Sequence, residues 1–536
     1  MGALTLKSFP FILRSWNVKS YDSIDPTDSF GQDTKVYVNK NQVVKIEPQF
    51  SNNTGPFWLT DKGRQFFDSI FGKISRNSSQ LEDLPGKTIG QWEALFKNIS
   101  TTFYVFDICN FKNVKKHFFI IVFENVNIEI LNFLSLISQK HSFIKVRRAE
   151  NLKVNADLEI NFQINSATSS SKLGVSSLGL LIGVNPRYEG SHLNLKLRQR
   201  YFKGNFKLLS IGSLLNLTFP VSFLGSNLSI LKSIAEGNQT ACKDIVNANN
   251  PTIITNTETF KHNNAQELVN CFKVLNHANI LTKVWNGYNV LNSSLYETGI
   301  YSSVRFSSLT LKDLLSFSSL YLINVDLNNI VHLKKIAESR LLNYKSSHVL
   351  SNKKLLLNQN FQASTLRVSK HITFGKCLYL PNNIFFENQE SFINTEGSIK
   401  RTTRLISRKN MKNDWQLLRK FVKSFRSNAT LSDIKNNKIV SYNSKTLFGF
   451  KNFMNFQFYA TQTLTNLNFY LNTKNQKFTI YEKFNRFKNS PMKLVSTKLK
   501  YWLDDFYTGG KDTFCSNSLL LTKCSMNYRL QMTNFF

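Results

Sequence analysis

Two patterns of apolar and polar residues follow one another along the chain. Between residues 15 and 50 apolar residues recur at alternate positions, as in TKVYVNKNQVVKIEPQF, where NKNQ interrupts the alternation. Such alternation predicts half-buried strands, and the short polar interruption predicts a hairpin turn. We therefore expect a small β-rich module over residues 1–56. After the linker SNNTGP, helical spacing begins in LTDKGRQFFDSIFGKI and recurs in TIGQWEALFKNI.

From about residue 100 to residue 330, compact apolar runs alternate with amphipathic helical stretches. The runs are TTFYVFDI, HFFIIVFENV, SFIKVRR, LGLLIGV, FKLLSIG, PTIITNTETF and SLYLINV, and helices are expected at SHLNLKLRQRYFK, NLSILKSIAEG and NAQELVNCFKVLNHA. Strands that are apolar throughout are typical of a parallel sheet covered by helices on both faces. The predicted fold class is α/β, with a largely parallel sheet in an α/β domain over residues 57–425.

The loop in LLIGVNPRYEG is the clearest candidate for a ligand site. Sheets of this kind bind ligands at the carboxyl ends of their strands, and Gly183, Asn185 and Pro186 end an apolar strand here. Arg187 is then placed to face a phosphate. The alternative is that Asn185 and Pro186 only end the strand and cap the turn, and the lack of a GxGxxG or Walker pattern favours it.

No catalytic or metal-binding residue is assigned from the sequence. The chain has no nucleophile elbow, HExxH or paired-carboxylate motif. Its 6 cysteines include no CxxC pair and no His at a metal-ligand spacing, so we expect reduced thiols and no iron–sulfur cluster bound by this chain alone. No apolar run approaches the roughly 20 residues of a membrane span, so none is expected.

The charge of the chain suggests a different class of function. Its 68 basic and 34 acidic residues give a formal net charge of +34, which points toward nucleic acid or an anionic surface. The excess reflects scarce acidic residues, and the basic residues are spread along the chain. This spread favours solvated faces, or surfaces that meet acidic partner subunits, over nucleic-acid binding. An RNA-binding or ribosome-associated mitochondrial protein is kept as the alternative.

Several segments, in order, resemble the C-terminal portion of the large iron–sulfur (seventy-five-kilodalton) subunit of respiratory complex I. The resemblance runs from GALTLKSFPF at residue 2 to about residue 425. Its most specific part is CLYLPNNIFFENQESFINTEGSIKRTTRLISRKNMKNDWQLLRKF, where the matching residues are Leu380, Pro381, Glu387, Asn394, Thr395, Glu396, Gly397, Asp414 and Trp415. Residues 426–536 are expected to be a lineage-specific extension with a family-like end motif.

The resemblance implies a fold like that of the molybdopterin oxidoreductases, a small β-rich module followed by α/β/α layers. Gly183 to Pro186 match the GxNP loop that lies against the nucleotide part of the cofactor in the molybdenum enzymes. Because the complex I branch carries no molybdenum cofactor, we expect no cofactor and no active site of this chain's own. A surviving molybdopterin enzyme is a third hypothesis, but the loop offers no convincing Cys or Ser ligand.

The implied role is structural: the chain would scaffold the iron–sulfur electron-transfer chain from NADH to ubiquinone in the matrix arm. The expected partners are a separate chain carrying the iron–sulfur clusters, the flavin-containing NADH-binding subunit and other matrix-arm subunits, without nucleic acid. The expected location is the matrix side of the mitochondrial inner membrane.

The beginning of the chain leads to a further expectation. Because GALTLKSFPF matches mature family sequence, we expect it not to be a removable presequence, and the chain to be one half of a split subunit encoded in the mitochondrion. Phe9, Phe11, Ile12 and Trp16 are candidates for an apolar clamp on the cluster-bearing half, worth on the order of several kcal/mol if buried. Their alternative role is ordinary packing within the β-rich module.

Overall fold

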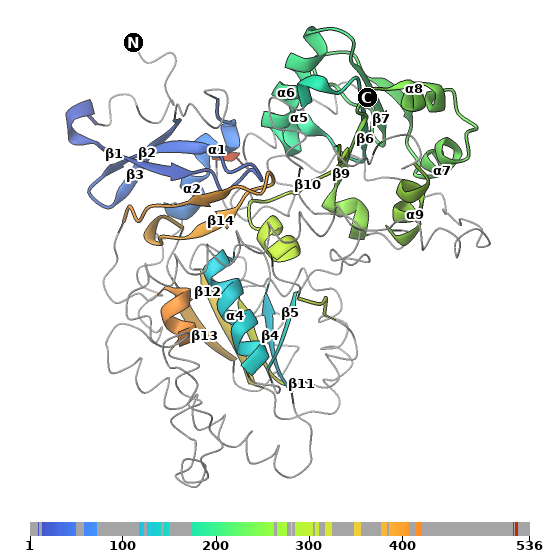
Figure 1. The fold of residues 1–536 in the computed structure, drawn as a ribbon. Coiled ribbons are helices and arrows are strands. Elements are labelled where there is room, and N and C mark those ends of the chain that lie inside the picture. The colour runs from blue at the N-terminus through green and yellow to red at the C-terminus, as the bar shows by residue number, and fades with distance from the viewer. Residues whose placement is uncertain are drawn as a thin grey trace, which may run out of the picture.

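Two parallel sheets and a small antiparallel module make up the part of the chain that the structure describes (Figure 1). The computed structural model describes residues 9, 13–49, 58–71, 117–122, 126–140, 144–148, 164, 173–261, 265–275, 280, 285–303, 306–309, 317–323, 348–354, 377–382, 385–406, 413–419, 518, 520, 521 and 523. The expected elements in TIGQWEALFKNI and TTFYVFDI lie outside these residues, as do residues 426–500.

The N-terminal module is an antiparallel sheet of three strands in the order β1-β2-β3, as the alternating pattern predicts. Its strands are β1 (Lys19–Ile24), β2 (Asp33–Asn39) and β3 (Gln42–Pro48), preceded by a 3-10 turn, η1 (Ser15–Asn17). The pairing of Asn39 with Gln42 closes the predicted hairpin, and Lys40 turns it with φ +52°. The helical spacing that follows forms α1 (Asp61–Gln65) and α2 (Phe67–Phe71), and the Thr60 hydroxyl caps α1 by accepting from the Gly63 N–H.

The first parallel sheet has the strand order β10-β9-β6-β7-β8. Its strands are β6 (Leu178–Ile182), β7 (Lys207–Ile211), β8 (Ser222–Gly225), β9 (Thr252–Asn256) and β10 (Tyr288–Leu291). Every residue of β6 and β9 is buried, as their continuous apolar runs predict. The helices of this part are α5 (Pro186–Glu189), α6 (Ser191–Phe202), α7 (Ser229–Ala235), α8 (Ala241–Asn247) and α9 (Ala265–Leu275).

Helices cover both faces of this sheet, so the predicted α/β/α layering is confirmed. Leu180 and Ile182 of β6 share a core cluster with residues of α7 and α9, whereas Leu181 points to the opposite face. There it packs with Leu193 and Leu197 of α6. Successive side chains of a strand point to opposite faces, so one apolar strand contributes to two cores.

The second parallel sheet, in the order β13-β12-β11-β4-β5, is built from segments far apart in the sequence. Its strands are β4 (His117–Val122), β5 (Ile144–Arg148), β11 (Phe317–Ile323), β12 (His348–Lys354) and β13 (Cys377–Asn382). Helix α4 (Ile128–Lys140) lies against it. Its Leu131, Leu134 and Ile137 belong to the core cluster that also contains Leu180 and Ile182 of β6. The whole first sheet is inserted between β5 and β11.

A short hairpin, β14 (Ser391–Ile393) and β15 (Ile399–Arg401), lies beside the N-terminal module (Figure 1). The Thr395 N–H donates to the Ser29 carbonyl at 2.9 Å, and the Lys400 ammonium lies 2.9 Å from the nearer Asp33 carboxylate oxygen. Phe386, in the 3-10 turn η9 (Phe385–Glu387), stacks on Phe66 with ring centroids 5.4 Å apart. The segment with the most specific family motifs thus completes the core of the N-terminal module.

The remaining described elements are η4 (Leu173–Val175), η5 (Thr257–Lys261), a π-helical turn η7 (Gly299–Ser303) and a helix over 414–419. Near the C-terminus, the Ser518 hydroxyl donates to the Asp68 carboxylate at 2.9 Å. Among the described helices, none combines the length and the apolar composition needed to cross a membrane. The predicted domain boundaries at residues 56 and 425 stay predictions.

Candidate functional site at the carboxyl end of the first parallel sheet

The chain reverses its progress across the first parallel sheet at strand β6. Strands β7 and β8 follow on one side of β6, whereas β9 and β10 lie on its other side. In open α/β sheets, ligands bind outside the carboxyl ends of the strands at such a reversal. The candidate site is therefore the edge formed by the loops that follow β6, β9 and β10.

The loop after β6 turns sharply at Gly183. This residue has φ +63°, and its N–H donates to the Ile211 carbonyl at the end of β7 over 2.8 Å. A glycine adopts this left-handed conformation without the steric cost that a Cβ brings. Asn185 then precedes α5, and Pro186 occupies the first helical position, where a missing N–H is tolerated.

The four residues predicted from the sequence lie in this one turn, but Asn185 and Arg187, like Gly183, donate hydrogen bonds to the chain itself. The Asn185 N–H donates to the Glu189 carboxylate at 3.2 Å, and the Arg187 guanidinium donates to the Asn216 carbonyl at 3.0 Å. The Asn185 side chain is buried, and its Oδ1 accepts no hydrogen bond within the described part of the chain. A role of Gly183, Asn185, Pro186 or Arg187 toward a cofactor stays a prediction.

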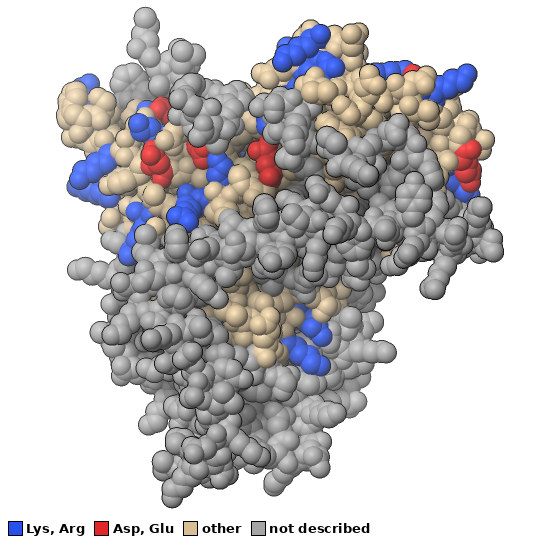
Figure 2. All heavy atoms as spheres, viewed as in Figure 1, with Lys and Arg blue, Asp and Glu red and all other residues tan. Residues whose placement is uncertain are grey.

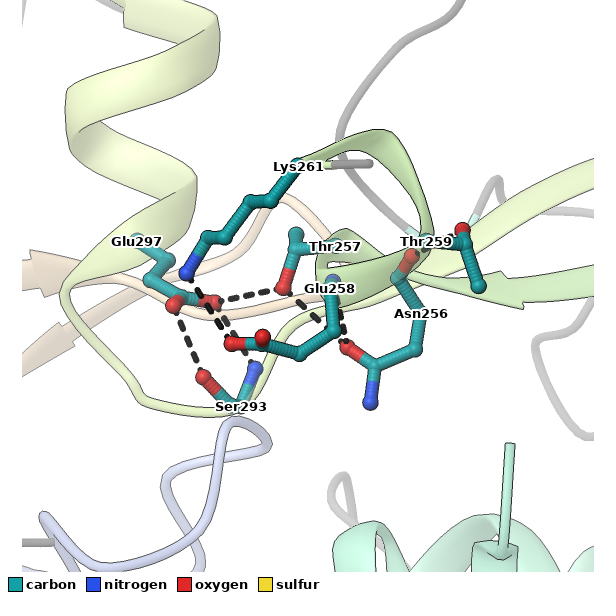
Figure 3. Close-up of polar contacts among 7 residues, drawn as sticks. All are labelled: Asn256, Thr257, Glu258, Thr259, Lys261, Ser293 and Glu297. Atoms are coloured by element: carbon teal, nitrogen blue, oxygen red, sulfur yellow. Dashed lines mark hydrogen bonds and ion pairs between the residues drawn. The ribbon is translucent and has the colours of Figure 1, made fainter. Parts of the chain in front are cut away.

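The loops after β9 and β10 are joined by the carboxyl group of Glu297 (Figure 3). Glu297 is 1% exposed. Its Oε2 accepts from the Ser293 N–H at 2.8 Å, and its Oε1 accepts from the Ser293 hydroxyl at 2.7 Å. The Thr257 hydroxyl lies 3.3 Å from the same Oε2. Glu297 therefore ties the end of β10 to the end of β9.

Asn256, the last residue of β9, fixes the conformation of the loop that follows β9. Its Oδ1 accepts from the Glu258 N–H at 3.2 Å, and its carbonyl accepts from the Thr259 hydroxyl at 2.6 Å. Glu258 and Lys261 form an ion pair at 3.0 Å across the same 3-10 turn, each side chain about one quarter exposed. Figure 3 shows this pair beside the Glu297 carboxyl. The edge is therefore polar and contains two carboxyl groups, one of them paired with an ammonium group.

The histidine beside this edge supplies no positive charge. His192, in the first turn of α6, is buried with its ring 5.3 Å from that of Phe30. Burial lowers the pKa of His192 to about 4, with a smaller contribution from the nearby Lys196 ammonium. The imidazole is therefore neutral at physiological pH, and Lys196 itself is paired with Glu396 at 2.8 Å.

Sequence reasoning missed Glu297 and its donors. One signal was present: the apolar strands β9 and β10 end in Asn256-Thr257 and Asn292-Ser293, so two polar pairs occur at the same edge of a parallel sheet. The carboxylate that joins them is 40 positions from Thr257. Among the described side chains, no group of three or more His, Cys, Asp or Glu is placed to hold a metal ion.

The fold is an α/β fold whose first parallel sheet reverses its strand order at β6. The comparison with family models identifies the class of protein. The model of the molybdopterin oxidoreductase family matches residues 125–424, more than half of the chain, and the chain belongs to this family. The matched region contains β6 to β10 and the candidate edge.

The chain is similar to named subunits of one respiratory enzyme. It is 26% identical over 82% of its length to the NADH-ubiquinone oxidoreductase 75 kDa subunit of Reclinomonas americana, covering 60% of that protein. It is 27% identical over 56% of its length to the mitochondrial 78 kDa subunit of Neurospora crassa, covering 40%. With the mitochondrial NADH dehydrogenase (ubiquinone) iron-sulfur protein 1 of Solanum tuberosum it shares 22% identity over 78% of its length, covering 53%.

These comparisons confirm the resemblance that the sequence motifs indicate. The chain spans about half of the length of the relatives it matches, between 40% and 60% in these three. The predicted α/β class with a small antiparallel module and a molybdopterin-oxidoreductase-like arrangement is confirmed by the fold and by the family match.

The described residues at the edge do not fit the cofactor that gives the family its name. Molybdopterin carries phosphate, and a phosphate needs backbone N–H groups, hydroxyls or cations that are open to it. Here the Ser293 N–H and hydroxyl are taken by Glu297, and the Asn185 N–H is taken by Glu189. At the Asn185 and Ser293 N–H groups an incoming anion meets carboxylates, so we derive no chemistry through this cofactor.

Proposed function

We propose that this chain is a structural, non-catalytic subunit of the matrix arm of respiratory complex I. In this role it holds the iron–sulfur centres that pass electrons from NADH toward ubiquinone. The observation that carries the proposal is the similarity to the Reclinomonas americana 75 kDa subunit over 82% of the chain.

The candidate site is consistent with a supporting role. Its most buried acidic group, Glu297, accepts hydrogen bonds from fixed donors instead of facing open space. A group held in this way is poorly suited to exchange protons with a substrate, whereas it fastens two loops together. Electron transfer depends on redox centres held in fixed positions by folded protein, and a rigid scaffold contributes that geometry.

The proposal also specifies the partners of the chain. We propose that a separate polypeptide carries the iron–sulfur clusters, and that the flavin-containing NADH-binding subunit and other matrix-arm subunits belong to the same assembly. Trp16 of the predicted clamp has a side chain that is 78% exposed, so it is available to a partner instead of packing in the N-terminal module. The ring centroid of Phe9 lies 4.7 Å from the Lys45 ammonium nitrogen. Phe11 and Ile12 lie outside the described residues.

The proposed location is the matrix side of the mitochondrial inner membrane, with the gene in the mitochondrion. The Neurospora crassa relative is named as mitochondrial, and the assembly that we propose is bound to that membrane. The chain would join it through contacts with other subunits.

The distribution of charge favours this role over RNA binding. On the face drawn in Figure 2, the described Lys and Arg side chains lie at several separate places, and Asp and Glu lie among those of the N-terminal module. A nucleic-acid surface usually gathers its cations along one face or groove.

The decisive experiment is a native gel of detergent-solubilised mitochondrial membranes, with mass spectrometry of the band that oxidises NADH. We expect this chain in that band, in equal amount with a cluster-bearing partner. Recovery of the chain with ribosomal particles, and its absence from the NADH-oxidising band, contradicts the proposal. A single longer polypeptide that carries both this sequence and the clusters contradicts only the split.

A further inference from the structure

Glu297 is an unusual residue for the place that it occupies. It is 1% exposed at the carboxyl edge of a parallel sheet, where the ends of strands normally offer backbone and side-chain donors to a ligand. A buried carboxylate is costly unless it is hydrogen-bonded, and here the donors come from two neighbouring loops. Both of its oxygens are used.

The donors around Glu297 are of the kind that binds a phosphate oxygen. The Ser293 N–H at 2.8 Å and the Ser293 hydroxyl at 2.7 Å approach the two carboxyl oxygens from one residue. The Thr257 hydroxyl approaches Oε2 from the neighbouring strand end, although its single proton is shared with Asn256 Oδ1 at 3.1 Å. Hydrogen bonds from such donors stabilise the ionised form of the acceptor.

We propose that the Glu297 carboxylate is a built-in anion that fills a phosphate-type site between the ends of β9 and β10. It closes this edge of the sheet to phosphate-bearing ligands and replaces the contacts through which such a ligand would join the two loops. The inference concerns the candidate edge alone, and it does not depend on the proposed place of the chain in complex I.

A second carboxylate repeats the arrangement at the neighbouring loop. Glu189 accepts from the Asn185 N–H at 3.2 Å, and its own N–H donates to the Asn185 carbonyl at 2.9 Å. The second of these bonds is an ordinary helical backbone bond, whereas the first satisfies the Asn185 N–H without a ligand. The Asn185 N–H after β6 and the Ser293 N–H after β10 thus both donate to side chains of the chain itself.

The proposal predicts that removing Glu297 opens a site for an added anion. In Glu297→Ala, the Ser293 N–H and the Ser293 hydroxyl lose their acceptor, the Thr257 hydroxyl keeps only Asn256 Oδ1, and a space of carboxylate size is left between the loops. We expect the melting temperature of the full chain to fall in chloride buffer. Inorganic phosphate, at the same ionic strength and pH, should then restore at least half of the loss.

The matched control is Glu258→Ala, which removes the same charge from the same edge. Glu258 pairs with the partly exposed Lys261, whereas the Ser293 N–H and hydroxyl donate to Glu297. We expect a small change in its melting temperature and no greater response to phosphate than in the unaltered chain. An equal phosphate response in Glu258→Ala and Glu297→Ala contradicts the proposal, as does a Glu297→Ala chain that melts like the unaltered one.

Two further measurements keep the proposal testable if Glu297→Ala fails to fold. Glu297→Gln fills the same space without charge, and we expect it to lose stability without any recovery in phosphate; recovery in this variant overturns the inference. Calorimetric titration of the unaltered chain with inorganic pyrophosphate should show no binding. Binding that is lost in Ser293→Ala would mean that the edge is open to a phosphate ligand and that Glu297 does not close it.

Discussion

Burial is the main cause of a raised pKa at two acidic side chains of this basic protein. Asp28, in the turn between β1 and β2, is 6% exposed, and Glu129, in the first turn of α4, is fully buried. Burial raises the pKa of Asp28 from 3.8 to about 7, and repulsion from Asp25 adds to it. Burial likewise raises the pKa of Glu129 from 4.5 to about 7, although it accepts from the Ser391 N–H at 3.3 Å.

These raised pKa values predict that stability falls as pH rises from about 4 to about 7. In that window the unfolded chain releases the Asp28 proton while the folded chain retains it, so the unfolded state is favoured. Asp28→Asn cannot ionise but can still accept from the Phe30 N–H, which lies 3.3 Å from Asp28 Oδ1. We expect the variant to gain on the order of 1 to 4 kcal/mol over the unaltered chain at about pH 8, and little at about pH 4.

Denaturant unfolding at the two pH values measures this difference. Asp22→Asn, which removes an exposed carboxyl from neighbouring β1, is the control and should follow the unaltered chain. Glu129 retains its own raised pKa in both variants, so the fall of stability with pH should become shallower in Asp28→Asn without vanishing. A gain in Asp28→Asn that is the same at both pH values rules out burial of the ionisable carboxyl as its cause.

At the scale of elements, the β14–β15 hairpin shows how a distant segment completes the N-terminal module. Asn394 is 2% exposed, and its Nδ2 donates to the Phe30 carbonyl at 3.1 Å. Its Oδ1 accepts from the Ser398 N–H at 2.8 Å across the hairpin turn. One side chain therefore both shapes the turn and fastens it to residues far away in the sequence.

Asn394→Ala should loosen this attachment. It leaves the carbonyl of the buried Phe30 without its partner, and the N–H of the exposed Ser398 loses its acceptor, at a cost of about 1 to 3 kcal/mol. The control is Glu396→Gln in the same turn, which weakens an ion pair with Lys196 whose glutamate is 31% exposed; we expect less than about 1 kcal/mol. Denaturation midpoints and proteolysis within residues 385–406 measure both. Equal effects of the two variants contradict the docking role of Asn394.

The sequence pattern predicts individual elements better than their arrangement. The runs LGLLIGV, FKLLSIG and PTIITNTETF become β6, β7 and β9, and SHLNLKLRQRYFK becomes α6. Burial of a strand on both faces leaves a continuous apolar run, and burial of a helix on one face leaves a helical spacing of apolar residues. The separation into two parallel sheets leaves no such signal. It depends on β4 pairing with β11 rather than with β6, which is a choice among apolar strands of similar composition.

The sequence predicted only the part of the candidate site that lies in the single loop after β6. Gly183, Asn185, Pro186 and Arg187 are consecutive or nearly so, and their backbone-breaking residue types mark the end of β6. Glu297 is a single glutamate in SSLYETG, and nothing local distinguishes it from a solvent-exposed one. Its importance arises when β9 and β10 pair in parallel and bring Thr257 and Ser293 to the same edge.

At the scale of the whole molecule, the proposal places redox chemistry outside this chain and positioning within it. The described part combines two parallel sheets with a shared apolar core cluster, to which α4, α7 and α9 all contribute. Such continuity holds surfaces on different elements in a fixed relation, as a support for electron-transfer centres requires.

The full chain, purified apart from its partners, should therefore contain no stoichiometric iron, flavin or molybdenum. Elemental analysis and the visible absorption spectrum measure this, and the control is the NADH-oxidising assembly from the same membranes, which should contain iron and flavin. Cluster ligands are mostly cysteine thiolates, and the buried Cys271 has a pKa raised to about 12 by burial, the opposite of what a ligand needs. A full iron–sulfur cluster on the isolated chain would make it an electron carrier and contradict the supporting role.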